Sequence, residues 1–156
     1  MPADNKAIIR RYYQDLFSKG NLSVADEIYA SKVIGHALWI NPIDTVTSAT
    51  ITGPSEDTPS DIKAAIGVWR ESFRDLNITI DDMLEIGDKI ISLYTLKGTH
   101  VRGTPITLMG IDITRISDGR IVEYWQSWDR LGMYQQLGVV PSTTELLSKI
   151  KGTGPS

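Results

Sequence analysis

Apolar and aromatic residues recur at the spacing of one helical face near the start of the chain. Asp4 is a suitable N-cap and Gly20 a suitable stop, so this pattern predicts a helix between them. A shorter helix is predicted over 23–30. A third begins at Thr58, where a capping residue precedes a proline, and it ends by Asp75. The stripe of the first helix consists of Ile8, Ile9, Tyr12, Tyr13, Leu16 and Phe17.

The stretch between the second and third helices changes character along its length. Residues 33–39 are apolar and contain one imidazole, that of His36. Residues 41–59 are rich in Thr, Ser, Pro and Asp, which predicts a long irregular excursion. Within it, only 45–52 has the composition of a weak strand.

Alternating apolar residues over 77–129 predict a run of antiparallel strands, the first of which turns at 87–88. A helix over 130–137 and a C-terminal tail over 139–156 follow. The later strands are expected at 90–100, 104–117 and 120–128.

The dipeptide Asp118-Gly119 joins the last two strands as a two-residue turn, and such a turn sets the pairing of the strands. The predicted pairs are Ile116 with Ile121, Asp112 with Trp125, and Leu108 with Asp129. Side chains alternate along a strand, so Asp112, Trp125 and Asp129 are expected on one side of the sheet. We expect that side to line a pocket beneath the helices, because it mixes carboxylates and an indole with small residues. The opposite side is the cleaner apolar face and carries Met109, Ile111 and Trp128.

The composition is that of one compact domain over 1–156, because 41% of the residues are hydrophobic and 22% are charged. A formal charge of −3 without a basic block argues against a nucleic-acid partner. The chain has no cysteine and two histidines, so disulfides are excluded and no metal site is expected. No apolar run approaches the roughly 20 residues that cross a bilayer, and the N-terminus lacks the order of a signal peptide. We therefore expect a cytoplasmic protein without a membrane partner.

Six short strings follow one another in an order that is typical of one family. With the order of helices and strands, they resemble the SnoaL-like polyketide cyclases of the NTF2-like superfamily. The resemblance implies an α+β cone, in which three N-terminal helices pack on a strongly curved antiparallel sheet with a central pocket. The strings are FRDL at 73–76, GTH at 98–100, GID at 110–112, DGRIVE at 118–123, WQSWD at 125–129 and QLG at 136–138.

Two features depart from the pattern of the family. The connection between His100 and Ile106 is shorter than the usual loop, and the excursion over 41–59 is longer. Both departures predict a pocket rim that differs from that of the family, so the resemblance does not identify the substrate.

The resemblance further implies a cofactor-independent aldol ring closure on a small hydrophobic or polyketide-like ligand. An aspartate then takes a proton beside a carbonyl, and burial must raise its pKa for this work near neutral pH. Asp129 is the first candidate, because it occupies the position of the acid/base aspartate in the family's W-x-x-x-D string. The structural alternative is that Asp129 caps the helix beginning at Arg130. Asp112 is the second candidate, and its alternative is a buried structural carboxylate.

His36 and His100 resemble pocket positions of the cyclases, where a neutral imidazole can orient a carbonyl. His36 could equally donate one hydrogen bond in the core. Whether His100 faces the pocket depends on the length of the loop that follows it. Aromatic side chains are candidates for the substrate-binding wall, with ordinary core packing as the alternative for each. They are Trp39, Trp69, Trp125, Tyr12 and Tyr13.

Three other functions fit the same fold. A ketosteroid-isomerase-like enzyme could use Tyr12 or Tyr13 as a hydrogen-bond donor. An epoxide-hydrolase-like enzyme would need an arginine between the carboxylates, and alternation points Arg115 away from that side. A ligand-binding protein without catalysis needs only a pocket. A homodimer across the apolar sheet side is expected in every case, because one layer of helices cannot cover both sides.

Overall fold

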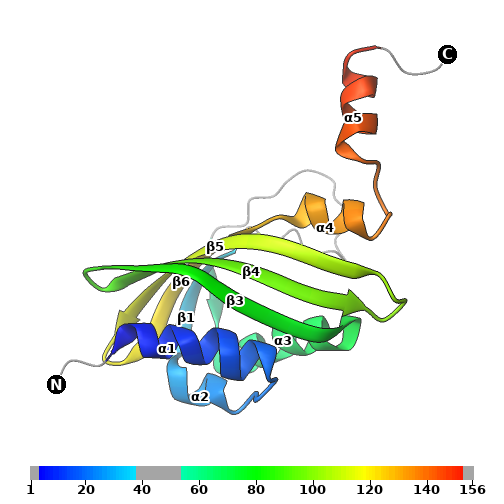
Figure 1. Cartoon of the computed structure of the whole chain (residues 1–156). Coiled ribbons are helices and arrows are strands. Elements are labelled where there is room, and N and C mark those ends of the chain that lie inside the picture. The colour runs from blue at the N-terminus through cyan, green and yellow to red at the C-terminus, as the bar shows by residue number, and fades with distance from the viewer. Residues whose placement is uncertain (1–3, 38–53, 153–156) are drawn as a thin grey trace.

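The computed structural model describes residues 4–37 and 54–152, which form one six-stranded sheet with helices against one side (Figure 1). The strand order is β2-β1-β6-β5-β4-β3. All neighbouring strands are antiparallel except β1 and β6, which are parallel, so the sheet is mixed rather than purely antiparallel. The strands are β1 (Tyr29–Ala37), β2 (Ser55–Asp57), β3 (Phe73–Ile86), β4 (Lys89–His100), β5 (Pro105–Ser117) and β6 (Arg120–Trp128).

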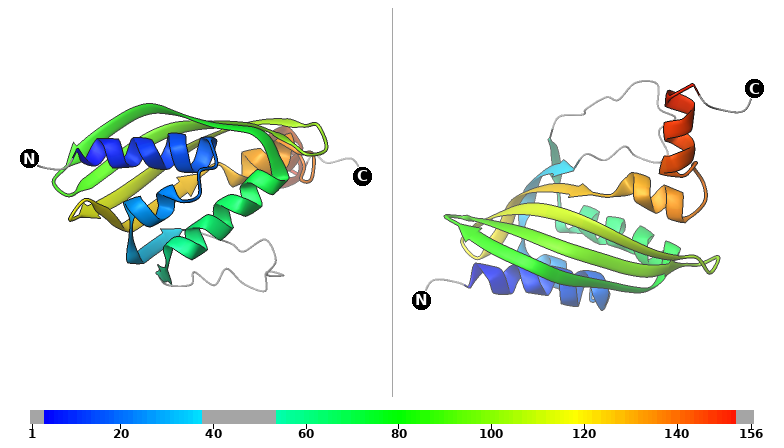
Figure 2. Two further views of the ribbon diagram at one scale, coloured as in Figure 1. Left: turned by 90° about the horizontal axis from the view of Figure 1, so that it is seen from below. Right: turned by 45° about the horizontal axis from the view of Figure 1, so that its top comes forward.

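Three helical segments lie against one side of this sheet, and the sheet curves around them (Figure 2). The first is α1 (Asn5–Arg11), which continues as a π-helix, η1 (Tyr12–Ser18). The others are α2 (Val24–Ile28) and α3 (Pro59–Ser72). After β6, the helix α4 (Arg130–Gln136) follows, and α5 (Thr143–Ile150) points away from the sheet (Figure 1). The α+β fold expected from the sequence is confirmed.

Local capping signals set the helix boundaries. The Asp4 carboxylate accepts a hydrogen bond of 3.1 Å from the Ala7 amide and so begins α1. Thr58 and Asp61 form a reciprocal capping box at the start of α3. Gly20 adopts a φ of 75° after η1, as a helix stop requires. These boundaries agree with those predicted from the sequence.

Two strands were not predicted. β1 takes up the last two residues of the helix predicted over 23–30 and the stretch after it, because α2 already ends at Ile28. β2 lies at the end of the excursion over 41–59. β2 has only three residues, all polar, and shows no alternation that could mark it as a strand. The weak strand proposed at 45–52 and the side chain of Trp39 fall outside the described residues.

A β-bulge changes the register of the predicted hairpin. The turn pairs Ile116 with Ile121 as expected, but Arg115 lies opposite Glu123, so Val122 is the extra residue. Every pair beyond the bulge is shifted by one residue.

The shift reverses the predicted sides of β6. Asp112 lies opposite Gln126 rather than Trp125, and Trp125 lies opposite Ile113. The prediction that Trp125 shares a side with Asp112 is therefore wrong, and so is the placement of Trp128 on the outer side. The reason is that a one-residue slip turns all later side chains to the other side of the sheet.

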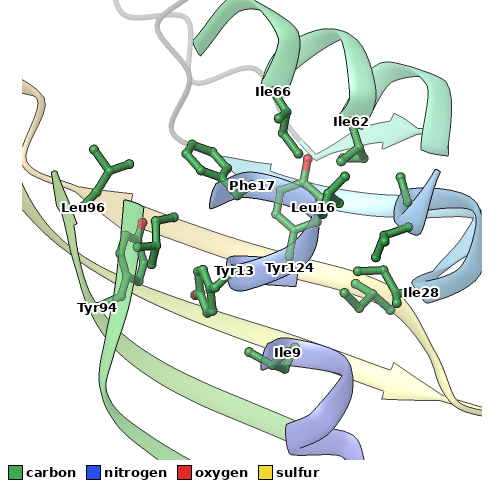
Figure 3. Close-up of a cluster of buried hydrophobic side chains, with 14 of the residues drawn as sticks. Ile9, Tyr13, Leu16, Phe17, Ile28, Ile62, Ile66, Tyr94, Leu96 and Tyr124 are labelled. Carbon is green, nitrogen blue, oxygen red and sulfur yellow. The ribbon is translucent and has the colours of Figure 1, made fainter. Parts of the chain in front are cut away.

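One hydrophobic core fills the space between the helices and the inner side of the sheet (Figure 3). Leu16 of η1 is completely buried there, whereas Leu84 of β3 is 53% exposed. The two leucines therefore provide a matched pair for testing this packing.

Leu16→Ala is expected to lower the free energy of unfolding by about 2–5 kcal/mol, because it removes buried methyl groups and leaves a cavity. Leu84→Ala is expected to cost less than about 1 kcal/mol, since its side chain is already half in water. Urea denaturation of both variants measures the difference. Equal losses would contradict the position of the core.

Candidate active site

A cavity of about 170 Å³ lies between the helices and the inner side of the sheet. Its exposed lining residues, Ser55, Asp61 and Ala65, mark the mouth beside β2 and α3. The complete lining among the described residues is Tyr12, Tyr13, Phe17, Tyr29, Ser55, Asp57, Asp61, Ile62, Ala65, Ile66, Trp69, Ile78, Tyr94, Leu96, Leu108, Tyr124, Gln126 and Trp128.

Five of the six tyrosines of the chain line this cavity, from η1, β1, β4 and β6. The π-helical turn contributes two consecutive ones, Tyr12 and Tyr13, whose ring centroids are 4.8 Å apart. Burial raises the pKa of each of the five phenols above the ordinary value of 10.0. At neutral pH they are therefore protonated groups that can donate hydrogen bonds into an otherwise apolar space.

The Asp112 carboxyl group lies directly behind two of these phenols. Its side chain is 2% exposed, and it accepts hydrogen bonds from the Tyr13 hydroxyl at 2.8 Å and the Tyr94 hydroxyl at 3.3 Å. Burial raises the pKa of Asp112 to about 7, although the hydrogen bonds from Tyr13, Tyr94 and Gln126 act in the opposite direction. This carboxyl group can therefore gain or lose a proton near neutral pH.

Gly110 makes room for the Tyr94 ring. It lies opposite Tyr94 across the β4–β5 ladder, and a Cβ atom placed there would be 2.3 Å from the ring carbon Cζ. Only glycine leaves enough space for the ring to cross the inner side of β5 and reach Asp112.

A second carboxylate, that of Asp57, lies in the cavity wall near the mouth. Tyr124 donates a short hydrogen bond to its Oδ2 atom, and the Ser55 hydroxyl donates to the same oxygen at 3.1 Å. A Cβ atom at Gly35 would lie 2.5 Å from the Tyr124 hydroxyl oxygen and 2.6 Å from Asp57 Oδ2. The glycine in β1 therefore allows this pair to form.

The described residues hold no group of three or more His, Cys, Asp or Glu side chains that could bind a metal ion. Within the same ranges, no helix is both long and apolar enough to cross a membrane. The polar groups of the described lining are phenols, two carboxyl groups, the Ser55 hydroxyl, two indoles and the Gln126 amide.

The sequence matches the SnoaL-like polyketide cyclase family over residues 7–137. The chain belongs to this family. No curated protein sequence matches it.

Several solved structures share the fold. A loop-truncation variant of IdmH is 25% identical, with a TM-score of 0.71 over 86% of this chain and 100% of that one. Wild-type IdmH from Streptomyces antibioticus, a candidate polyketide cyclase, is 24% identical, with a TM-score of 0.71 over 86% and 99% of the chains. A candidate polyketide cyclase from Acidithiobacillus ferrooxidans is 23% identical, with a TM-score of 0.73 over 90% and 99%.

Asp129, the first sequence candidate, is exposed and does not line the cavity of this family member. Its carboxylate caps α4 by accepting a hydrogen bond of 2.8 Å from the Gly132 amide. The prediction that Asp129 lies on the pocket side is wrong, because the bulge in β6 precedes it and changes the register. Its observed position is that of the alternative reading, in which Asp129 caps the helix beginning at Arg130.

His36 lies on the outer side of the sheet rather than in the pocket. Its ring stacks on Trp125 at a centroid distance of 4.7 Å, and its Nε2 atom is 2.7 Å from a Glu123 carboxylate oxygen. Arg115 donates two hydrogen bonds to the other oxygen of Glu123. His36 and Trp125 thus belong to an outer ionic cluster, and Trp125 does not form part of the pocket wall.

The remaining sequence candidates divide between the pocket and its surroundings. Tyr12, Tyr13 and Trp69 line the cavity. His100 ends β4, packs edge-on against Phe73 at 5.3 Å, and is not part of the described lining.

Sequence reasoning missed three pocket tyrosines, Tyr29, Tyr94 and Tyr124, and the carboxylate of Asp57. Tyr94 had a usable signal, because strict alternation places it on the side of β4 that also carries Leu96 and Ile90. Asp57 had none, since β2 is too short to show a pattern.

Asp112→Asn is expected to remove a pH dependence of stability. The folded protein keeps a proton on Asp112 up to about pH 7, whereas the unfolded chain releases it near 3.8. The resulting stabilisation is complete below the lower value and falls by about 1.4 kcal/mol per pH unit up to the higher one. Urea denaturation between pH 3.8 and about pH 7 should show this fall in the free energy of unfolding of the wild type and a smaller fall in the variant.

Asp88→Asn is the matched control, because it neutralises an exposed carboxylate in the β3–β4 turn. It should leave the slope of stability against pH close to that of the wild type. An unchanged slope in Asp112→Asn would show that the buried carboxyl group does not titrate in this range.

Proposed function

We propose that the protein is a cofactor-independent, cyclase-like enzyme that closes a ring by an intramolecular aldol reaction. The observation that carries this proposal is the buried Asp112 carboxyl group, with the Tyr13 and Tyr94 hydroxyls between it and the cavity. Family membership supports a cyclase-like role.

The first step is removal of a proton from the carbon beside a substrate carbonyl. Tyr13 accepts this proton at its hydroxyl oxygen while it passes its own proton to Asp112. The enolate carbon then attacks a second carbonyl of the same molecule, so one C–C bond forms and an alkoxide results. The proton held by Asp112 returns through a phenol to the alkoxide, and Asp112 is ionised again.

Such a cycle is most efficient when the pKa of the carboxyl group lies near the working pH. A pKa of about 7 meets that condition, and burial in the core is its cause. The raised pKa of Tyr13 prevents a lasting phenolate. The two proton transfers therefore have to occur together.

The size of the cavity limits the ligand. At about 170 Å³ it is close to an engineered protein cavity of about 150 Å³ that binds benzene. We infer that the buried part of the substrate is a single ring or a chain of similar volume. The fused ring systems of large polyketides would need a wider cavity.

An isomerase of the ketosteroid type is the second candidate. It would use the same first step. Once Asp112 is protonated, the Tyr94 hydroxyl is released to donate to the developing oxyanion, and the proton returns from Asp112 through Tyr13 to another carbon. The contact between Tyr94 and Asp112 favours it as much as it favours ring closure. Both reactions proceed through an enolate, so one assay can detect either.

Asp112→Asn is expected to lower the rate of enolisation by about 10²–10⁴-fold, as loss of a general acid/base does. The measurement is exchange of the hydrogens beside the carbonyl in D₂O, followed by NMR for a panel of small β-keto esters and enones. Tyr13→Phe should lower the rate as well, because it interrupts the path to Asp112.

Asp129→Asn tests whether Asp129, rather than Asp112, is the acid/base group. An asparagine can still cap α4, so this variant should keep both its fold and its rate. A loss of rate in Asp129→Asn together with an unchanged rate in Asp112→Asn would reverse the assignment and restore the first sequence candidate.

A homodimer is proposed across the outer side of the sheet. Met109 and Ile111 on β5 are 57% and 51% exposed there, and Ile34 on β1 is 41% exposed. Apolar residues gathered on one open sheet side are typical of a protein interface. Trp128, assigned to this side from the sequence, lies inward, with its ring 5.2 Å from that of Trp69.

Ile111→Glu should convert the dimer to a monomer, because two carboxylates would be buried against each other at the interface. Light scattering coupled to gel filtration measures the mass. Val68→Glu, at an exposed position of α3 on the helix side of the molecule, should leave the dimer intact. A monomeric wild-type protein would contradict the proposal.

A further inference from the structure

The cavity has an unbalanced charge. Asp57 and Asp61 are the charged side chains of its described lining, and no described lining residue is lysine, arginine or histidine. The nearest lysines in sequence have other partners, since Lys32 pairs with Glu56 at 2.8 Å and Lys63 with Asp26 at 2.6 Å. Within the described ranges, neither Asp57 nor Asp61 forms an ion pair.

The segment that joins β1 to β2 likewise contains acidic but no basic residues. Residues 38–53 contain no lysine, arginine or histidine and include one further carboxylate, Asp44. That segment therefore supplies no basic side chain that could neutralise the acidic mouth.

The hydrogen bonds of the Asp57 carboxylate leave one of its oxygens without a donor among the described residues. Asp57 Oδ2 receives its bonds from Tyr124 and Ser55, and no donor among the described residues binds its other oxygen. Tyr29 is 5% exposed and also lines the cavity.

Aromatic faces beside uncompensated negative charge are the surroundings that bind organic cations. The rings of Tyr12, Tyr29, Tyr124 and Trp69 line the same cavity. A ligand carboxylate or phosphate would be repelled there, because nothing in the described lining neutralises it. A neutral ligand would leave Asp57 without a positively charged partner, whereas Asp61 already accepts hydrogen bonds from Thr58 in the capping box of α3.

We propose that the ligand of this pocket carries a positively charged amine, either protonated or quaternary, which lies beside Asp57 at the mouth. The apolar remainder of the ligand extends toward Tyr13 and Tyr94. This inference rests on the proposed function only in requiring that the same cavity binds the substrate. It names the substrate class as a small, amine-bearing carbonyl compound.

The test compares choline with 3,3-dimethylbutan-1-ol, its uncharged carbon isostere. The two probes have nearly the same shape, so a difference in affinity reports the charge. Titration followed by the fluorescence of the pocket tryptophans gives both dissociation constants. We expect choline to bind about ten-fold more tightly, as a partly desolvated cation among aromatic rings does.

Asp57→Asn should weaken choline about five- to ten-fold and change the binding of the alcohol less than about two-fold. Glu71→Gln is the matched control, because it removes one exposed charge from α3, the helix that carries Asp61, away from the cavity lining. It should change neither constant. Equal affinities of the two probes for the wild type, or equal effects of Asp57→Asn on both, would overturn the proposal.

If Asp57→Asn does not fold, a salt titration of the wild type tests the same contribution of charge to choline binding. Raising the salt from about 0.01 M to about 1 M should weaken choline and leave the alcohol nearly unchanged. An unchanged affinity for choline would overturn the proposal. Enolisation that still depends on Asp112 would then leave the proposed function standing, so the two failures can be told apart.

Discussion

The burial of one carboxyl group, that of Asp112, constrains much of this structure. Moving an ionised carboxylate into an apolar core is costly unless hydrogen bonds replace its water. Tyr13 and Tyr94 provide these bonds from opposite layers, one from the helices and one from the sheet. The contact therefore fixes the spacing of the two layers and leaves a polar point in the wall of an apolar cavity.

Local departures from regular structure serve this arrangement. The π-helical turn presents Tyr12 and Tyr13 side by side to the cavity, and π-turns are frequent at functional sites. Gly110 and Gly35 remove side chains where Tyr94 and the Tyr124–Asp57 pair have to pass. A methyl group at either glycine would displace a phenol from its carboxylate.

The two sides of the sheet separate polar groups of different kinds. The inner side holds protonated phenols and a carboxyl group that can titrate, and it is closed by helices. The outer side holds a charged cluster, in which Arg115 and His36 both bind Glu123. Burial raises the pKa of Glu123, but the contacts with His36 and Arg115 together lower it further than burial raises it, so this carboxylate stays ionised and is unsuited to proton transfer at neutral pH. The acid/base role we propose therefore falls on the inner carboxyl group.

The sequence by itself determined the capped starts of the first and third helices, the order of the long strands, the Asp118-Gly119 turn and the inward direction of Asp112. These features depend on capping groups, turn residues and alternation, all of which act within a few residues. Only the tertiary structure decided the sides of Trp125, Trp128 and Asp129, because a bulge at Val122 has no local signature and reverses every later side chain. It also brought Asp57 to Tyr124 and Tyr13 to Asp112. Those contacts join residues 67 and 99 positions apart, and they arise from the packing of layers rather than from any pattern along the chain.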